Sequence, residues 1–159
     1  MEKVLGKSEE GMEILDILRN SEFFQGLSEK QLRKMVPYCE LQRLASGDSL
    51  FRQGEKADKL YLVKEGLLEV LVQARSGTEN QAAVVHLGAG QSIGEMSWVD
   101  KGRRSATVRA ISPSAEVVLI KFTRLNEICG RDFKIGFQVM RNIAVDLSFR
   151  LRQRDLVLL

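Results

Sequence analysis

The sequence predicts a mainly β fold with flanking helices: an antiparallel β-roll (jelly roll), a short helical bundle before it and a long helix after it. Between Cys39 and Phe122, short apolar runs are separated by glycines at a spacing typical of antiparallel barrels and jelly rolls. On either side of this region, apolar residues recur at helical spacing instead. The chain therefore divides into a helical lead-in (1–38), the β-roll (39–122) and C-terminal helices (123–159).

Two short helices are predicted in the lead-in. Met12–Arg19 carries its apolar residues at helical spacing. Ser28 and Gln31 fit a capping box, with Ser28 as the N-cap and Gln31 at the third helical position. The helix that they open runs toward Val36, and Pro37 ends it.

Short apolar runs between the glycines predict the strands of the roll. Glycines such as Gly47, Gly54 and Gly66 suit hairpin turns, because such turns need positive φ angles. The candidate strands are Glu40–Leu44, Ser49–Gln53, Lys59–Lys64, Leu67–Gln73, Ala82–Leu87, Ser105–Ile111 and Glu116–Phe122.

After Phe122 the pattern is helical to the end of the chain. A short helix is expected over Thr123–Cys129 with Gly130 closing it, followed by a long helix from about Asp132. An apolar stripe of heptad spacing runs along the long helix, with Arg154 at one position of the seam. Packing on the chain's own β-roll would account for the first half of this stripe, and a homodimer seam would account for its continuation. The stripe comprises Phe133, Phe137, Met140, Ala144, Leu147, Leu151 and Leu158.

The composition argues against several classes of protein. A chain of 159 residues suits one domain with helical extensions, and a formal net charge of +3 is too weak to indicate nucleic acid. His86 is the single histidine, whereas a jelly-roll metalloenzyme needs several metal ligands, so we expect no metal. The sequence has no nucleotide P-loop and no nucleophile elbow, so we expect neither an enzyme nor a bound cofactor. The polar N-terminus and the lack of a membrane-length apolar run lead us to expect a cytoplasmic protein without membrane contact.

The segment from Ile93 to Val108 is the most informative part of the chain. Gly94 and Glu95 open a short helical turn, and the free N–H groups of such a turn suit phosphate. Arg104, nine residues after Glu95, offers a planar fork that matches phosphate oxygens. The carboxylate of Glu95 can accept hydrogen bonds from sugar hydroxyls. Together these groups suit a phosphorylated ribose.

This segment resembles the phosphate-binding cassette of the cyclic-nucleotide-binding domain family, found in the cAMP-dependent kinase regulatory subunit and in the catabolite activator protein. The family pattern Phe-Gly-Glu-Leu-Ala-Leu, a loop and Arg-Ala/Ser/Thr-Ala-Thr/Ser-Val appears here as Ile-Gly-Glu-Met-Ser-Trp, a loop and Arg-Ser-Ala-Thr-Val. The lead-in and the glycine-bounded segment 47–66 are also similar to the family, so the resemblance covers roughly residues 20–150. It implies an eight-stranded roll with the cassette at residues 93–107.

The resemblance also implies roles for individual residues. Glu95 would hold the ribose 2′-hydroxyl and Arg104 the cyclic phosphate; Arg104 is favoured over its neighbour Arg103 because it directly precedes Ser-Ala-Thr. On the last helix, Arg141 and Asp146 are candidates for contacts with the base. The expected ligand contacts in the cassette are Ile93, Gly94, Glu95, Met96, Ser97, Arg104, Ser105 and Ala106.

The function that these features imply is a regulatory sensor. It would bind a 3′,5′-cyclic nucleotide, either cAMP or cGMP, draw its C-terminal helix over the base and signal to a downstream protein. One alternative is a ligand-free β-roll used only for docking, and others are a truncated transcription regulator of the catabolite-activator type or a regulatory fragment of a larger protein. No helix-turn-helix fits between the long helix and Leu159, so direct binding to nucleic acid is not expected of this chain unless it is truncated.

Overall fold

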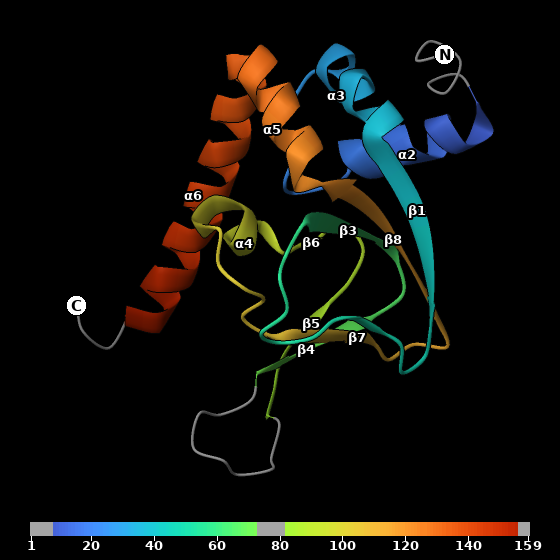
Figure 1. Cartoon of the computed structure of the whole chain (residues 1–159), viewed down its shortest axis with the longest axis vertical. Coiled ribbons are helices and arrows are strands. Elements are labelled where there is room, and N and C mark those ends of the chain that lie inside the picture. Colours follow the sequence, from blue (N-terminus) through green and yellow to red (C-terminus); the bar gives the residue numbers. More distant parts are fainter. Residues whose placement is uncertain (1–7, 73–81, 156–159) are drawn as a thin grey trace.

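Two four-stranded antiparallel sheets form the β-roll in the computed structural model, which describes residues 8–72 and 82–155. Within these residues the strand order is β1-β8-β3-β6 in one sheet and β2-β7-β4-β5 in the other (Figure 1). The mainly β fold with an eight-stranded roll is thus confirmed. The strands are β1 (Cys39–Ala45), β2 (Ser49–Phe51), β3 (Lys59–Glu65), β4 (Leu68–Val72), β5 (Ala82–Leu87), β6 (Ser92–Ile93), β7 (Thr107–Ala110) and β8 (Ser114–Lys121).

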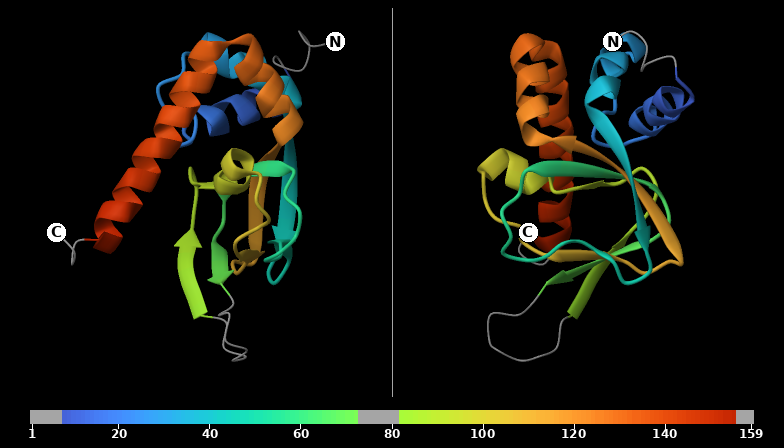
Figure 2. Two further views of the ribbon diagram at one scale, coloured as in Figure 1. Left: turned by 60° about the vertical axis from the view of Figure 1, so that its left-hand side comes forward. Right: turned by 45° about the vertical axis from the view of Figure 1, so that its right-hand side comes forward.

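The helices cover one end and one side of the roll. Helices α2, α3 and α5 gather at one end, and α6 runs from that end down along the side of the roll (Figures 1 and 2). The short helix α4 lies between α6 and the end of the roll. Their bounds are α2 (Glu9–Arg19), α3 (Glu29–Met35), the 3₁₀ turn η1 (Val36–Tyr38), α4 (Glu95–Asp100), α5 (Phe122–Arg131) and α6 (Phe133–Asp155).

Local sequence signals account for the start and end of α3. The hydroxyl of Ser28 accepts a hydrogen bond from the backbone N–H of Gln31, and the Gln31 side chain accepts one from the backbone N–H of Ser28. This is the predicted capping box, and it satisfies two N–H groups that the first turn leaves free. The α-helix ends at Met35, where the chain tightens into η1 around Pro37.

Both faces of the sheet that contains β3 and β8 are buried. On β3, Leu60 and Leu62 belong to a cluster with the helices, whereas Tyr61 and Val63 belong to a second cluster inside the roll. Successive side chains of a strand point to opposite faces, so one strand serves both clusters. This sheet therefore joins the helical layer to the interior of the roll.

The junction of α5 and α6 differs from the prediction. Gly130 does not end α5, which continues to Arg131. The chain instead leaves helical geometry at Asp132, whose φ is −130° and ψ is 93°. The Asp132 carboxylate accepts hydrogen bonds from the backbone N–H groups of Lys134 (3.1 Å) and Ile135 (3.4 Å). Asp132 thus separates the two helices by capping the second one, in the manner of an N-cap.

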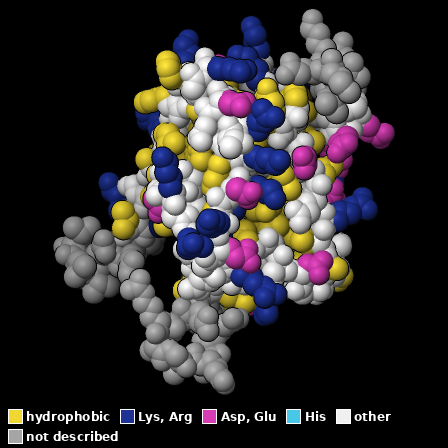
Figure 3. Space-filling view, in the orientation of Figure 1, with side chains coloured by type: hydrophobic (Ala, Val, Ile, Leu, Met, Phe, Trp, Pro, Cys, Tyr) yellow, Lys and Arg dark blue, Asp and Glu magenta, His cyan; other side chains and the backbone are white. Residues whose placement is uncertain are grey.

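The first half of the heptad stripe of α6 was expected to pack on the chain's own β-roll, but its residues are mostly exposed. The buried face of α6 is formed by Ile135, Val139 and Ile143, which lie in the helical cluster. On the stripe, Phe133 is 79% exposed and Phe137 is 67% exposed. Figure 3 shows apolar side chains at the surface along the edge where α6 lies. Toward the C-terminus, Met140 and Leu151 are also exposed, whereas Leu147 packs partly against the helical cluster.

The remaining differences concern the ends of elements. Strand β6 has only two residues, too few for an alternating pattern, and it was not predicted. Phe122, expected to end a strand, begins α5. Ser105 and Ala106, expected to begin a strand, precede β7. Leu158, like Gln73, lies outside the described residues, and so does the side chain of Arg154.

Within the described ranges there is neither a metal cluster nor a membrane-length helix. No three metal-ligating side chains come together there, and no helix is both long and apolar enough to serve as a membrane span. Both cysteines are free thiols; Cys39 is buried and Cys129 is half-buried.

Candidate ligand-binding site

A cavity of about 570 Å³ lies between the β-roll and α6. This volume is in the range of small-molecule sites. Each cassette residue that the sequence predicts as a ligand contact lines it: Ile93, Gly94, Glu95, Met96, Ser97, Arg104, Ser105 and Ala106. The structure thus gathers two segments, one around α4 and one before β7, on the same cavity.

Gly94 makes room for Arg104. A Cβ atom built on Gly94 would overlap Nη1 of Arg104 and would lie 3.3 Å from the backbone oxygen of Lys59. Gly94 also has a φ of +95°, in the left-handed region that side chains disfavour. Both the conformation and the close approach therefore require glycine at the start of α4.

The guanidinium of Arg104 is buried and only partly satisfied. Arg104 is 4% exposed, and its Nη2 donates a 2.6 Å hydrogen bond to the backbone oxygen of Lys59. Its guanidinium carbon lies 4.1 Å from the centroid of the Phe51 ring, a cation–π contact. Its Nε and Nη1 have no hydrogen-bond partner among the described residues. Burial lowers the pKa of Arg104, yet arginine stays charged in proteins, so the site holds a buried cation with free donors.

The loop before Arg104 is held by backbone hydrogen bonds. The N–H of Arg104 donates to the oxygen of Glu55 (2.9 Å), and its own oxygen accepts from the N–H of Gly54 (2.8 Å). Arg103, in contrast, is exposed, and its Nη1 donates to the backbone oxygen of Gly54 (3.1 Å). The two neighbouring arginines thus occupy opposite environments, with Arg104 facing the cavity.

Glu95 supplies a buried carboxylate to the same cavity. It is 6% exposed, and burial raises its pKa above the usual range. Its own backbone N–H, Arg150 and Arg104 lower that pKa, while Asp146 raises it. The nearest ion pair joins Oε1 of Glu95 to Nη2 of Arg150 on α6, at 3.7 Å. The cavity therefore presents an acceptor, Glu95, and a donor, Arg104, on one surface.

The C-terminal half of α6 forms another wall. Asp146 lines the cavity as the sequence predicts, together with Phe149 and Arg150, which the sequence analysis missed. Their positions, three and four residues after Asp146, put all three on one helical face. Counted from Asp146, this spacing identifies them once the face of α6 that meets the cavity is known.

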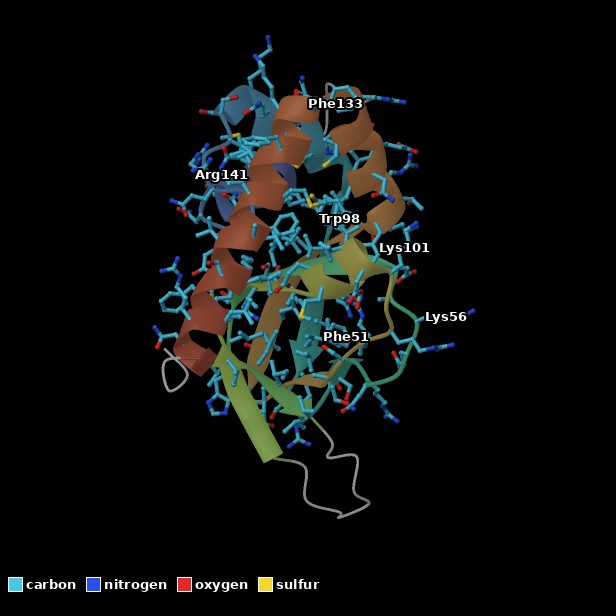
Figure 4. The ribbon with its side chains drawn as sticks, turned by 90° about the vertical axis from the view of Figure 1, so that its left-hand side faces the viewer. Phe51, Lys56, Trp98, Lys101, Phe133 and Arg141 are labelled. Carbon is cyan, nitrogen blue, oxygen red and sulfur yellow. The ribbon has the colours of Figure 1, made fainter. Side chains whose placement is uncertain are left out.

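Arg141, the second predicted base contact, does not line the cavity. It is exposed, and Figure 4 shows it on the outer side of α6, away from the roll. Five residues along an α-helix turn the side chain by about 140°, so Arg141 and Asp146 cannot face the same cavity.

Apolar side chains of the β-roll complete the cavity opposite α6. They are Val70 from β4 and Val85 and Leu87 from β5. The charged residue Glu22, from the connection between α2 and α3, also lines the cavity. Apolar side chains that line a cavity together with Phe149 suit an aromatic ring.

Trp98 links α4 to the helices. Its side chain is 8% exposed and belongs to the helical cluster, and Figure 4 shows it between α4 and the helical end of the molecule. Its Nε1–H donates a 2.9 Å hydrogen bond to Oδ1 of Asn126 on α5. Its ring lies 5.9 Å from that of Phe23. One short helix thus contributes Glu95 and Ser97 to the cavity and Trp98 to the helical core.

Comparison with known proteins identifies the family of this chain. Residues 41–132 match the sequence profile of the cyclic nucleotide-binding domain. The chain belongs to the cyclic nucleotide-binding domain family. The match contains the cassette, with Glu95 and Arg104, and ends at Asp132, before α6. Domains of this family bind a regulatory ligand and are not themselves catalytic.

Individual relatives agree with this assignment. The chain is similar to the Cyclic AMP receptor protein of Thermus thermophilus, with 31% identity over 141 residues, which is 89% of this chain and 62% of that protein. The crystal structure of the Catabolite Activator Protein of the same organism superposes with a TM-score of 0.73 at 29% identity, covering 87% of this chain and 62% of that one. The regulatory domain of Toxoplasma gondii PKA, co-crystallised with cAMP, superposes with a TM-score of 0.68 at 25% identity, covering 77% of this chain and 46% of that one. The chain thus spans less than two thirds of the length of each of these relatives.

Proposed function

We propose that this chain binds a 3′,5′-cyclic purine nucleotide, cAMP or cGMP, in the cavity between the β-roll and α6. It acts as a regulatory sensor and catalyses no reaction. Arg104 contacts the cyclic phosphate and Glu95 accepts a hydrogen bond from the ribose 2′-hydroxyl. The base lies toward Val70, Val85 and the α6 wall.

The unpaired donors of Arg104 carry this proposal. Burying a cation without full hydrogen bonding is costly, so a fold that keeps one buried does so for a partner that supplies charge and acceptors. The cyclic phosphate carries one negative charge and two exocyclic oxygens, and either oxygen can accept from Nε or Nη1. A 5′-monophosphate carries a larger, more strongly hydrated charge and lacks the fused ring that places phosphate and 2′-hydroxyl side by side.

Thermal unfolding tests the proposal without a label. A ligand at a hundred times its dissociation constant stabilises the fold by about 2.7 kcal/mol. For a domain of this size, the melting temperature should then rise by roughly 5–10 °C. The rise should occur with cAMP, cGMP or both, and not with equal concentrations of 5′-AMP or 5′-GMP. A melting temperature that no cyclic mononucleotide changes at millimolar concentration would favour a ligand-free docking module instead.

The ligand is expected to change the position of α6. The first half of this helix is fixed, because Asn142 donates hydrogen bonds to the backbone oxygens of Phe23 (3.0 Å) and Gln25 (2.8 Å). The second half reaches the cavity through Asp146, Phe149 and Arg150. A ligand that contacts these side chains favours the helix position that brings them closest, by the difference of its affinities for the two positions.

A homodimer through α6 is the assembly that we propose. The exposed stripe of Phe133, Phe137, Met140 and Leu151 lies on the face that the chain's own fold leaves open. Apolar residues at heptad spacing are buried when two such helices pair along a common seam. The downstream protein that receives the signal would bind the ligand-loaded dimer.

A further inference from the structure

Arg150 is the cation that α6 brings to Glu95. Its Nη2 lies 3.7 Å from Oε1 of Glu95 and 2.8 Å from Oδ2 of Asp146, one turn earlier in the same helix. Among the hydrogen bonds and ion pairs of the described residues, the contact with Glu95 is the one that joins α6 beyond Leu147 to another element. This ion pair thus joins the last turns of α6 to the cassette.

The charge balance of the cavity also depends on Arg150. Three carboxylates line the cavity, from Glu22, Glu95 and Asp146, against two guanidinium groups, from Arg104 and Arg150. Without Arg150 a single cation would face three carboxylates, a poor environment for an anionic ligand. Arg104 cannot replace it, because its Nη2 is committed to the backbone oxygen of Lys59 and its ring contacts hold it in the roll.

We propose that Arg150 is a positioning residue of the ligand site, which orients the Glu95 carboxylate for a sugar hydroxyl and fastens the end of α6 over the cavity. This inference rests on the proposed function for the identity of the ligand. The fastening of α6 itself does not, because the Arg150–Glu95 pair involves protein atoms alone.

The sign of the pH dependence follows from the groups around Glu95. Burial raises its pKa, Arg150 and Arg104 lower it, and Asp146 raises it; Glu22 lines the same cavity. While α6 covers the cavity, as it does with ligand bound, removing Arg150 therefore raises the pKa of Glu95 further. As the pH falls, Glu95 becomes protonated, and affinity for the ligand falls with it. That loss should begin at a higher pH in Arg150→Ala than in the wild type.

Hydrogen exchange in the ligand-free protein tests the fastening. In Arg150→Ala, the backbone amides of residues 146–153 should exchange several-fold faster, because their helical turns open more often. Arg150 also pairs with Asp146 within the helix, so Glu95→Gln provides the distinguishing variant. It should speed exchange similarly, and the double variant should add little to either single change. Arg152→Ala, exposed on the same helix without a contact to the cavity, should leave exchange near the wild-type rate.

The pH profile of nucleotide affinity tests the effect on Glu95. Calorimetric titrations between about pH 4.5 and 8 should show the earlier loss of affinity in Arg150→Ala, with Arg150→Lys following the wild type more closely because it restores the charge. A role in helix stability alone would lower affinity equally at every pH. Parallel profiles, together with additive exchange effects in the double variant, would overturn the proposal. The hydrogen-exchange experiment tests the fastening of α6 even if no cyclic nucleotide binds. The absence of nucleotide binding would refute the proposed function separately.

Discussion

The guanidinium of Arg104 occupies the space that a side chain at Gly94 would need. These two residues lie near opposite ends of the cassette, and both line the cavity. The proposed ligand site depends on this contact, since it fixes the position of the Arg104 guanidinium in the cavity that Glu95 also lines.

Gly94→Ala should therefore damage the ligand site more than the fold. A side chain in the left-handed region costs about 1–2 kcal/mol. Forcing Arg104 aside adds an overpacking cost of about 1–3 kcal/mol, which should weaken nucleotide binding roughly 5- to 150-fold. Gly47→Ala is the matched control, because Gly47 has a φ of +89° but no neighbouring atom within 4 Å of the position that a Cβ would take. Calorimetry should show near-normal affinity for Gly47→Ala, and equal affinities in the two variants would argue against the contact.

Arg104→Leu and Arg103→Leu should have very different effects. Removing one partner of a buried charged contact costs about 2–5 kcal/mol, so Arg104→Leu should weaken binding thirty- to several-thousand-fold. The variant should still fold, because leucine leaves no buried charge unpaired. Arg103 is exposed, so Arg103→Leu should change affinity little. Greater damage from the Arg103 change, measured by titration with the same nucleotide, would show that the cassette register is wrong.

Ligand binding should change the fluorescence of Trp98, the single tryptophan of the chain. Because Trp98 and Glu95 share the short helix α4, a ligand that shifts α4 also shifts the indole against Asn126 and Phe23. Titration with cyclic nucleotide should alter the emission intensity or maximum in a saturable way, at the concentration where calorimetry shows binding. Binding by calorimetry with no change in emission would mean that α4 stays fixed against α5.

The dimer proposal can be tested with exposed residues alone. Met140→Glu combined with Leu151→Glu should turn a dimer into a monomer, because both side chains are exposed on the stripe and charges there would be buried in the seam. Val145→Glu is the control, since Val145 is 60% exposed but lies off the stripe. Light scattering would give the mass of each variant. A wild-type chain that is monomeric at high concentration, with and without nucleotide, would rule the seam out.

Local signals made much of the fold and the cassette predictable. The capping box of Ser28 and Gln31 depends on residues three apart, and the glycines at Gly47, Gly54 and Gly66 adopt the positive φ angles that their turns need. The cassette likewise depends on a short run of sequence, so its residues fall together on the cavity. Such features are encoded over a few positions, and tertiary packing does not override them.

Features that depend on packing at a distance were predicted less well. The face of α6 that meets the cavity is set by the break at Asp132 and by the burial of Ile135 and Val139, which the helical period alone does not reveal. For that reason the sequence suggested Arg141, which points outward, and missed Phe149 and Arg150. The apolar surface from β4 and β5 was missed as well, because it becomes a cavity wall only where these two paired strands lie across from α6.

Calorimetric titration of the wild-type chain with cAMP and with cGMP tests the central claim most directly. The account predicts saturable binding of at least one of them with one site per chain, and its loss in Arg104→Leu under the same conditions. No measurable heat with either nucleotide up to millimolar concentration, together with an unchanged melting temperature, would contradict the claim that Arg104 and Glu95 form a cyclic-nucleotide site.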